Sequence, residues 1–147
     1  MSELTSGEQK AYNTFKKFEQ IYTDGKLELI DELVSEDFRH HAPFPTPDGK
    51  DEYKKFQQQF REAFPDFTST PQEEVVSENK VAQAFVMQAT HKGEFMDIPA
   101  TGNKVEMEGI SIYRIEDGKI AEEWVQPDMM AMMQQLGVAP APDEADQ

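Results

Sequence analysis

The sequence predicts an α+β fold in which three helices precede a mostly antiparallel sheet and a short helix closes the fold. A change of pattern supports this order. Before Pro65, apolar residues recur at three- and four-residue steps, as on one face of a helix; after it, they alternate with polar residues, as in strands. The 147 residues include no Cys, so the core must be stable as one domain without disulfides.

The first helix is expected to begin after Thr5 and to end near Asp24-Gly25, because Thr5 and Glu8 have the spacing of a capping box. Its apolar stripe consists of Ala11, Phe15, Phe18 and Tyr22. A short second helix is expected over residues 27–34 and should give way at residues 35–37.

The stretch His40–Gly49 contains three prolines, which exclude a continuous helix and predict a loop. A third helix should start at Asp48 as its N-cap and end at Pro65. Its apolar stripe consists of Tyr53, Phe56, Phe60 and Phe64.

Four strands are expected beyond Pro65, in two hairpins. Residues 67–77 and 81–91 form the first, and residues 104–115 and 119–126 form the second, joined by the turn dipeptide Asp117-Gly118. A last helix is expected from Asp128 to Leu136, with Gly137 after its end. Residues 138–147 should form a disordered tail behind a single domain of residues 1–137.

The two-residue turn at Asp117-Gly118 predicts a regular register in which residue 113 faces 122 and residue 111 faces 124. One sheet face would then carry Val105, Met107, Ser111, Tyr113, Ile115, Ile120, Glu122, Trp124 and Gln126. The other would carry Glu106, Glu108, Ile110, Ile112, Ala121, Glu123 and Val125. Helices can cover only one face, so apolar residues on the second predict a homodimer.

Acids outnumber bases by 29 to 14, which gives a formal net charge of -15. Such a surface repels phosphate backbones and anionic lipids, so we expect neither a nucleic-acid nor a membrane partner. The N-terminus lacks the pattern of a signal peptide and no long apolar run occurs, so a cytoplasmic location is expected.

Phosphate-binding glycine loops and a hydrolase serine elbow are absent from the sequence. If the chain is extended at His40 and His41, the two side chains point to opposite sides, so only one can enter a given pocket. Neither these two nor His91 has the spacing of a zinc motif, so we expect no metal or cofactor.

Several polar residues have two interpretations. His91 lies at the end of a strand and is interpreted either as a structural residue or as a catalytic one. Asp128 is placed either as the N-cap of the last helix or in a functional site. Glu106 and Glu108 lie near Ile110, where apolar neighbours would raise a carboxyl pKa and allow proton transfer; otherwise they belong to an ordinary polar strand edge.

The segment 93–124 resembles the SnoaL-like polyketide cyclase family, also described as predicted ester cyclases, and the resemblance extends over about residues 8–136. Its motifs are Thr90-His91-Lys92-Gly93-Glu94-Phe95, Ile98-Pro99-Ala100-Thr101-Gly102, Gly109-Ile110-Ser111-Ile112-Tyr113-Arg114 and Asp117-Gly118-Lys119-Ile120, followed by Glu122, Trp124 and Asp128. Upstream, His41-Ala42-Pro43 and Ala63-Phe64-Pro65-Asp66 also match the family's habits.

This resemblance implies the nuclear transport factor 2-like fold, a curved sheet wrapped around helices to form a conical pocket. It also implies a homodimer through the outer sheet face. Family cyclases close a polyketide ring by intramolecular aldol condensation without a cofactor, using a pocket carboxylate to move the proton. Isomerase or hydrolase chemistry on a small apolar carbonyl compound is a related expectation, and the alternative is a non-catalytic ligand-binding or dimeric interaction module.

By the same resemblance, His91, Asp128 and either Glu106 or Glu108 are the expected catalytic residues, although the characterised cyclases have Asp where this chain has Glu. The pocket is expected to include His41, Tyr22, Trp124 and Glu122.

Overall fold

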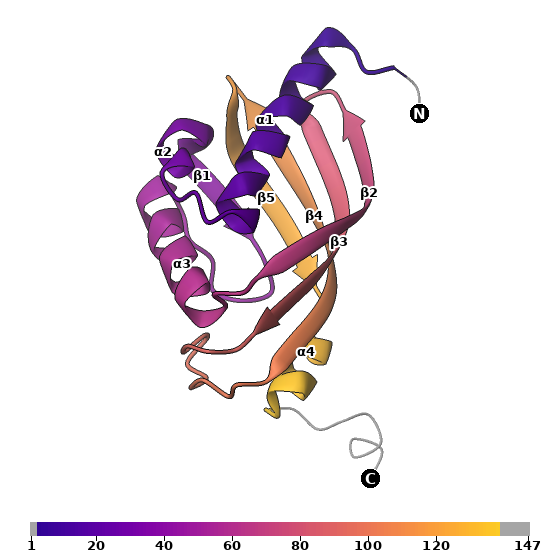
Figure 1. Cartoon of the computed structure of the whole chain (residues 1–147). Helices are drawn as coiled ribbons and strands as arrows, with labels where there is room; N and C mark the ends of the chain where they lie inside the picture. Colours follow the sequence, from indigo (N-terminus) through magenta and orange to yellow (C-terminus); the bar gives the residue numbers. More distant parts are fainter. Residues whose placement is uncertain (1–2, 139–147) are drawn as a thin grey trace.

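The computed structural model describes residues 3–138, which form four helices and five strands (Figure 1). In chain order these are α1 (Ser6–Thr23), α2 (Leu29–Leu33), β1 (Val34–His41), α3 (Lys50–Ala63), β2 (Thr68–Ser77), β3 (Lys80–Thr90), β4 (Lys104–Glu116), β5 (Lys119–Pro127) and α4 (Met129–Leu136).

The five strands form one curved sheet in the order β1-β5-β4-β3-β2. Neighbouring strands are antiparallel except β1, which runs parallel to β5. The helices α1, α2 and α3 lie on one side of this sheet, and α4 lies at its lower end (Figure 1). The predicted α+β class is therefore confirmed, and the arrangement is the expected nuclear transport factor 2-like cone.

The ends of the helices follow local chemistry. At the start of α1, the Thr5 hydroxyl accepts from the Glu8 N–H at 3.1 Å and the Glu8 carboxylate accepts from the Thr5 N–H at 2.9 Å, so the predicted capping box is confirmed. The N-cap of α3 is Gly49 rather than the predicted Asp48, because Asp48 forms a bridge with Arg39 of β1.

Strand β1 differs from the expectation, because its last residues belong to the stretch His40–Gly49, whose prolines predict a loop. Its residues alternate between the two sides of the sheet, with Phe38 and His40 buried and Arg39 and His41 exposed. Pairing with β5, which is some eighty positions away in sequence, stabilises this segment as a strand. Short-range patterns do not reveal a partner that distant.

The predicted register of the β4–β5 hairpin is wrong beyond Ile115. Ile115 pairs with Ile120 as expected, but Arg114 pairs with Glu122, because Ala121 is an extra residue in β5. This β-bulge shifts every later residue of β5 to the opposite face. Glu123 and Val125 therefore point inward, while Glu122 and Trp124 point outward.

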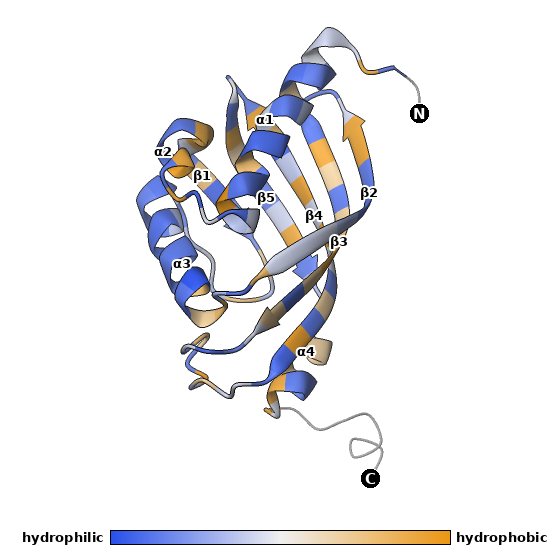
Figure 2. Cartoon of the chain, viewed as in Figure 1, coloured by the Kyte–Doolittle hydropathy of each residue, from blue (hydrophilic) through white to orange (hydrophobic). Residues whose placement is uncertain are grey.

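The core between sheet and helices consists of two apolar clusters. One joins α1, α2 and β1 to the upper sheet around Phe15, Phe18 and Tyr113. The other joins the end of α3 to β3, β4 and α4 around Phe60, Met107 and Met132. The sides of α1 and α3 that face the viewer in Figure 2 are largely hydrophilic, as expected of helices that bury only one face.

Within the described residues, no helix combines the length and the apolar character needed to cross a membrane. The predicted tail lies outside the described residues except for Val138, so its disorder and the domain boundary at residue 137 stay predictions.

Candidate functional site

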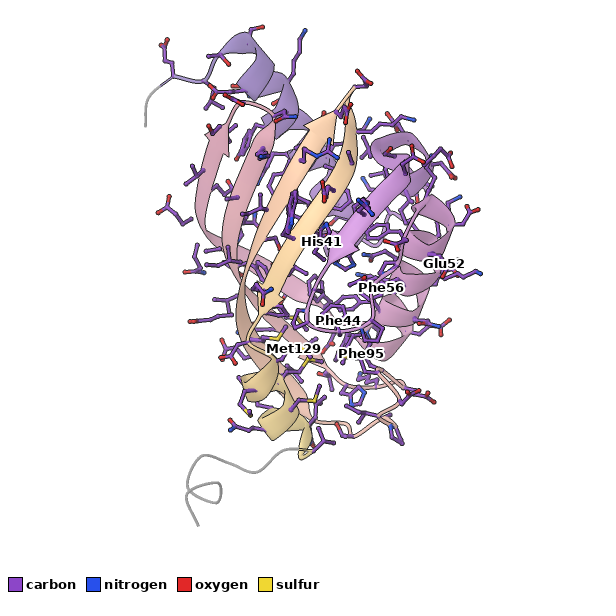
Figure 3. The ribbon with its side chains drawn as sticks, turned by 180° about the vertical axis from the view of Figure 1, so that it is seen from behind. His41, Phe44, Glu52, Phe56, Phe95 and Met129 are labelled. Carbon is purple, nitrogen blue, oxygen red and sulfur yellow. The ribbon has the colours of Figure 1, made fainter. Side chains whose placement is uncertain are left out.

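A partly open cavity of about 170 Å³ lies between the concave face of the sheet and the helices. Its walls are mainly aromatic and methionine side chains: Phe18, Phe44, Phe56, Phe60, Phe67, Phe85, Phe95, Met87, Met107, Met129 and Met132. Figure 3 shows four of these, Phe44, Phe56, Phe95 and Met129, gathered where α3, α4 and the loop after β3 approach one another. The lining suits a small, largely apolar molecule.

Glu123 and His40 are the central polar residues of this cavity. They are partners in the β1–β5 register, and both are buried. His40 Nε2 lies 3.8 Å from Glu123 Oε1, which is too far for a direct hydrogen bond. Both ring nitrogens of His40 and Oε1 of Glu123 lack a hydrogen-bond partner among the described residues.

Burial raises the pKa of Glu123 to about 8, and a hydrogen bond with the Tyr113 hydroxyl opposes the rise. Tyr113 is the direct cross-strand neighbour of Glu123 on β4. The carboxyl can therefore release and regain a proton close to neutral pH.

Burial, with a smaller contribution from the neighbouring His41, lowers the pKa of His40 to about 4, while Asp48 acts in the opposite direction. His40 is therefore a neutral imidazole at pH 7, with one N–H donor and one nitrogen lone pair. Because Glu123 is mainly protonated at that pH, the pair is neutral rather than an ion pair.

Tyr22 of α1 brings a hydroxyl to the same cavity. Its oxygen lies 2.7 Å from that of Tyr53, which in turn accepts from the Gln57 amide at 3.0 Å. Tyr53 is fully buried, so donating its proton to Tyr22 avoids an unpaired buried donor. In that direction the proton of Tyr22 is left for the cavity. Burial raises the pKa of both phenols well above the ordinary value, so they remain donors.

A separate polar network on the wall between α1 and the β2–β3 strands is internally paired. The Gln83 amide donates to Glu19 at 2.6 Å and to Glu74 at 2.8 Å, and the Lys16 ammonium lies 2.9 Å from Glu19. These groups already satisfy one another, so they are structural in character. His40 and Glu123, in contrast, are available to a ligand.

A second His–Glu pair lies on the outer face of the same two strands. His41 Nε2 is 2.6 Å from Glu122 Oε2, and the His41 ring stacks on Trp124 at 5.2 Å between centroids. The hydrogen bond from His41 is the main cause that holds the pKa of Glu122 below its ordinary value, and Arg114 adds to it.

The structure places one of the four predicted pocket residues in the cavity. Tyr22 lines it, whereas Glu122, Trp124 and His41 form the outer cluster. Glu122 and Trp124 point outward rather than into the cavity because of the bulge at Ala121.

The residues predicted to be catalytic are not brought together around the cavity. Glu106 and Glu108 are exposed on the outer face of β4, and Gln88 donates to Glu106 at 3.0 Å. Asp128 is the N-cap of α4, with Oδ1 accepting from the Ala131 N–H at 3.1 Å. Catalytic roles for these three residues stay predictions, and capping accounts for the position of Asp128.

His91 is completely buried but does not line the cavity. Its ring packs against Phe64, Nδ1 lies 3.0 Å from the Thr101 hydroxyl, and its backbone pairs with Asn103 and Gly102. His91 therefore fastens both ends of the loop after β3. Because Phe95 of that loop is part of the cavity wall, His91 holds the wall in place; its catalytic role stays a prediction.

His40 and Glu123 were not among the predicted site residues, because the prolines near His40 indicated a loop and the regular hairpin register placed Glu123 on the outer face. The inward position of His40 depends on the β1–β5 pairing, and that of Glu123 depends on the bulge at Ala121, so no local signal identifies either residue. Within residues 3–138, no three His, Asp or Glu side chains gather as ligands for a metal ion.

The curved sheet that wraps around the helices defines the class as a nuclear transport factor 2-like protein. The sequence pattern of the SnoaL-like polyketide cyclase family matches residues 13–136, and the chain belongs to this family. The expected family resemblance is thereby confirmed.

Solved structures support the same assignment. IdmH from Streptomyces antibioticus is 32% identical over 87% of this chain and 99% of IdmH, with a TM-score of 0.73. A candidate SnoaL-like polyketide cyclase from Jannaschia sp. CCS1 has a TM-score of 0.83 over 95% of this chain and 100% of its own, at 17% identity. TsrD from Streptomyces laurentii has a TM-score of 0.79 and 24% identity over 93% of this chain and 100% of TsrD. The last two show the fold alone. No curated protein matches the chain.

Proposed function

We propose that this chain is a cofactor-independent enzyme in which Glu123 moves a proton during ring closure of a small apolar carbonyl compound. The observation that carries the proposal is the buried carboxyl of Glu123, whose Oε1 has no hydrogen-bond partner among the described residues, beside the unpaired ring of His40 in a mainly apolar cavity. Unpaired buried polar groups cost stability, so their presence favours a ligand that bonds to them.

In the first step the Glu123 carboxylate takes a proton from the carbon next to a carbonyl group. The electron pair of the broken C–H bond moves to the carbonyl oxygen, which becomes an enolate. The Tyr22 hydroxyl and the His40 N–H are the donors that stabilise this oxygen. Because His40 Nε2 and Glu123 Oε1 are 3.8 Å apart, one substrate oxygen placed between them can lie at an ordinary hydrogen-bond distance, about 2.8 Å, from both atoms.

In the second step the enolate carbon attacks a second carbonyl carbon of the same molecule. One C–C bond forms, and the electrons of the attacked C=O bond move to its oxygen. That oxygen takes the proton back from the Glu123 carboxyl, so the residue returns to its starting state. The product is an isomer of the substrate, and no oxidant or reductant is consumed.

The lining of the cavity favours a neutral substrate. Among the described residues that line it, none is Lys or Arg, while Glu123 and Glu19 carry carboxyl groups. An anionic substrate would meet no counter-charge there. Cyclisation is favoured over other enolate chemistry by the family and by IdmH, whose name describes it as a candidate polyketide cyclase.

Enolisation can be tested without the natural substrate. The probe is 2-tetralone, a neutral bicyclic ketone, and NMR measures the exchange of its α-protons for deuterium in D2O. We expect the protein to accelerate exchange and Glu123→Gln to lower the rate at least about 100-fold. Glu122→Gln is the matched control, because it changes the adjacent residue on the opposite face and should keep the rate.

The pH dependence of the exchange rate tests which protonation state of Glu123 is active. Because the carboxylate is the base, the rate should rise with pH and level off above about 8, the pKa of Glu123. A rate that falls through this range would contradict the role of base. If 2-tetralone binds but exchange stays at the buffer rate, the cavity is a binding site and the enzymatic proposal is wrong.

A further inference from the structure

Gln83 of β3 contributes an amide to the cavity wall at a distance from Glu123. Only 7% of the Gln83 surface is exposed. Along β4, Tyr113 pairs with Glu123, and Ser111, two positions away on the same face, pairs with Gln83. The backbones of Gln83 and Glu123 are therefore about 10 Å apart across the strands and about 7 Å apart along them. The two side chains can contact opposite ends of one bound molecule.

The amide nitrogen of Gln83 has no hydrogen left for a ligand. It donates to Glu19 Oε1 at 2.6 Å and to Glu74 Oε2 at 2.8 Å, which uses both of its N–H bonds. The amide oxygen, Oε1, takes no part in this network. It accepts no hydrogen bond from the described residues and is not completely enclosed. This oxygen is therefore the part of Gln83 that remains for a ligand, and it can only accept.

The two carboxylates fix the orientation of the amide. In the reversed orientation the oxygen of Gln83 would face both of them, and a charged carboxylate has no hydrogen to donate. Burial acts to raise the pKa of Glu74, but hydrogen bonds from Gln83 and Tyr12 and the charge of Lys16 hold it below the ordinary value, so Glu74 is charged. Hydrogen bonds from an amide N–H to carboxylates also polarise the amide and make its oxygen a stronger acceptor.

The rest of this part of the wall does not favour a ligand that only accepts. Ser69 and Ser111 carry hydroxyls that can donate or accept, and Glu19 adds a carboxylate. Among the described residues that line the cavity, none is Lys, Arg or Trp, the side chains that only donate. The end of the cavity at Gln83 is thus built mainly of acceptors.

We propose that Gln83 Oε1 is a specificity determinant that binds a neutral hydroxyl group at the end of the substrate remote from the reacting carbon. The inference rests on the proposed function, because it takes the cavity as the substrate site. An ether or ketone oxygen at that position would meet an acceptor to which it cannot bond, and an anionic oxygen would in addition lie near Glu19 and Glu74. The enzyme would therefore select substrates in which this hydroxyl is free.

The test compares two ketones of nearly the same shape by NMR titration of the full chain. In 6-hydroxy-2-tetralone the hydroxyl is on the ring remote from the ketone, and in 6-fluoro-2-tetralone a fluorine that cannot donate replaces it. The wild type should bind the hydroxy ketone at least about fivefold more tightly than the fluoro ketone. In Gln83→Leu the two dissociation constants should become equal to within about twofold, because the acceptor is gone.

Gln88→Leu is the matched control. Gln88 is the same residue type on the same strand, but it is exposed on the outer face, where it donates to Glu106 at 3.0 Å. This variant should keep the preference for the hydroxy ketone. If Gln83→Leu does not fold by circular dichroism, the side-chain amide signals of Gln83 in the wild type supply the comparison. The hydroxy ketone should shift them, and the fluoro ketone should not.

Equal affinities of the wild type for the two ketones would overturn the proposal, and so would a preference that folded Gln83→Leu retains. Equal shifts of the Gln83 amide signals by both ketones would also contradict it. These are binding measurements, so they separate this inference from proton transfer. A hydroxyl preference without α-proton exchange would reject the proposed function alone, whereas exchange without the preference would reject the role of Gln83 alone.

Discussion

His40 Nε2 lies 3.8 Å from Glu123 Oε1 inside the cone, and one position away on each strand His41 and Glu122 form a 2.6 Å pair on the outside. The parallel β1–β5 pairing creates both pairs. The inner pair is buried and neutral near pH 7, whereas the outer Glu122 is held in its charged form by His41 and Arg114. The same two residue types therefore differ in character between the two faces of the sheet. Glu122 and His41 on the outer face can serve as control positions for Glu123 and His40 on the inner face.

The free energy of unfolding should depend on pH through the inner pair. Glu123 has a higher pKa in the folded chain, about 8, than its ordinary 4.5, so its contribution to stability is lost as pH rises from 4.5 to 8. His40 has a lower pKa when folded, about 4, than its ordinary 6.5, so its contribution is lost as pH falls from 6.5 to 4. Between pH 4.5 and 6.5 the two contributions change in opposite directions, so they cancel in the free energy of unfolding.

Above pH 6.5, Glu123 is the member of this pair that still changes its protonation. The free energy of unfolding of the wild type should therefore fall by about 2 kcal/mol relative to that of Glu123→Gln between pH 6.5 and 8. Urea unfolding at several pH values measures the difference. Glu122→Gln should keep the wild-type slope in this window. Parallel curves for the wild type and Glu123→Gln would show that Glu123 has an ordinary pKa.

Tyr53→Phe should slow the exchange of 2-tetralone about tenfold without changing its affinity, because Tyr22 loses the neighbour that orients its proton. The unpaired Gln57 amide should also cost about 1–2 kcal/mol of stability. Tyr12→Phe is the control, since Tyr12 donates to Glu74 at 2.8 Å outside the cavity lining.

The double variant Tyr53→Phe/Gln57→Leu separates the two effects. It removes the unpaired amide and should recover stability but not rate. Recovery of the rate together with stability would show that Tyr53 acts only on folding.

Most of the fold could be predicted because its signals are local. The capping box of α1, the Asp117-Gly118 turn and the Gly137 end of α4 all depend on neighbouring residues, and the structure has each of them. Strand β1 depends on its pairing with distant β5, and the bulge at Ala121 depends on what the core accepts there, so neither could be deduced from a local pattern.

Strand β1 and the bulge at Ala121 determine which residues face the cavity. The prediction that only one of His40 and His41 enters a pocket is correct as geometry, but the resemblance pointed to His41 and the structure places His40 inside. A carboxyl with a raised pKa among apolar groups was also expected, and Glu123 is such a carboxyl. A shift of one residue in β5 was enough to exchange the faces.

Gly109→Ala should weaken the binding of 2-tetralone. A Cβ at Gly109 would lie 2.6 Å from Cζ of the Phe85 ring, so this ring must move, and Phe85 is part of the cavity wall. We expect at least about a threefold loss of affinity by NMR titration and a lower melting temperature. Gly7→Ala, where an added Cβ meets nothing within 4 Å, is the control. Unchanged affinity in Gly109→Ala would mean that Phe85 does not shape the binding site.

Substitutions of Asp128 distinguish capping from catalysis. Asp128→Ala should lower stability by about 1 kcal/mol because α4 loses its N-cap, whereas Asp128→Asn should keep the cap and the exchange rate. Urea unfolding and the exchange assay measure the two effects. A folded Asp128→Asn variant without exchange activity would restore the predicted catalytic role of Asp128.

The most direct test of the central claim is a carbon-13 NMR titration of the Glu123 side-chain carboxyl in the full chain. Its signal is assigned as the one that is missing from the spectrum of Glu123→Gln. The account predicts a midpoint near pH 8, the pKa that burial gives this carboxyl. A midpoint near the ordinary value of 4.5 would contradict it, because Glu123 would then be permanently charged at neutral pH and too weak a base for the proposed proton transfer.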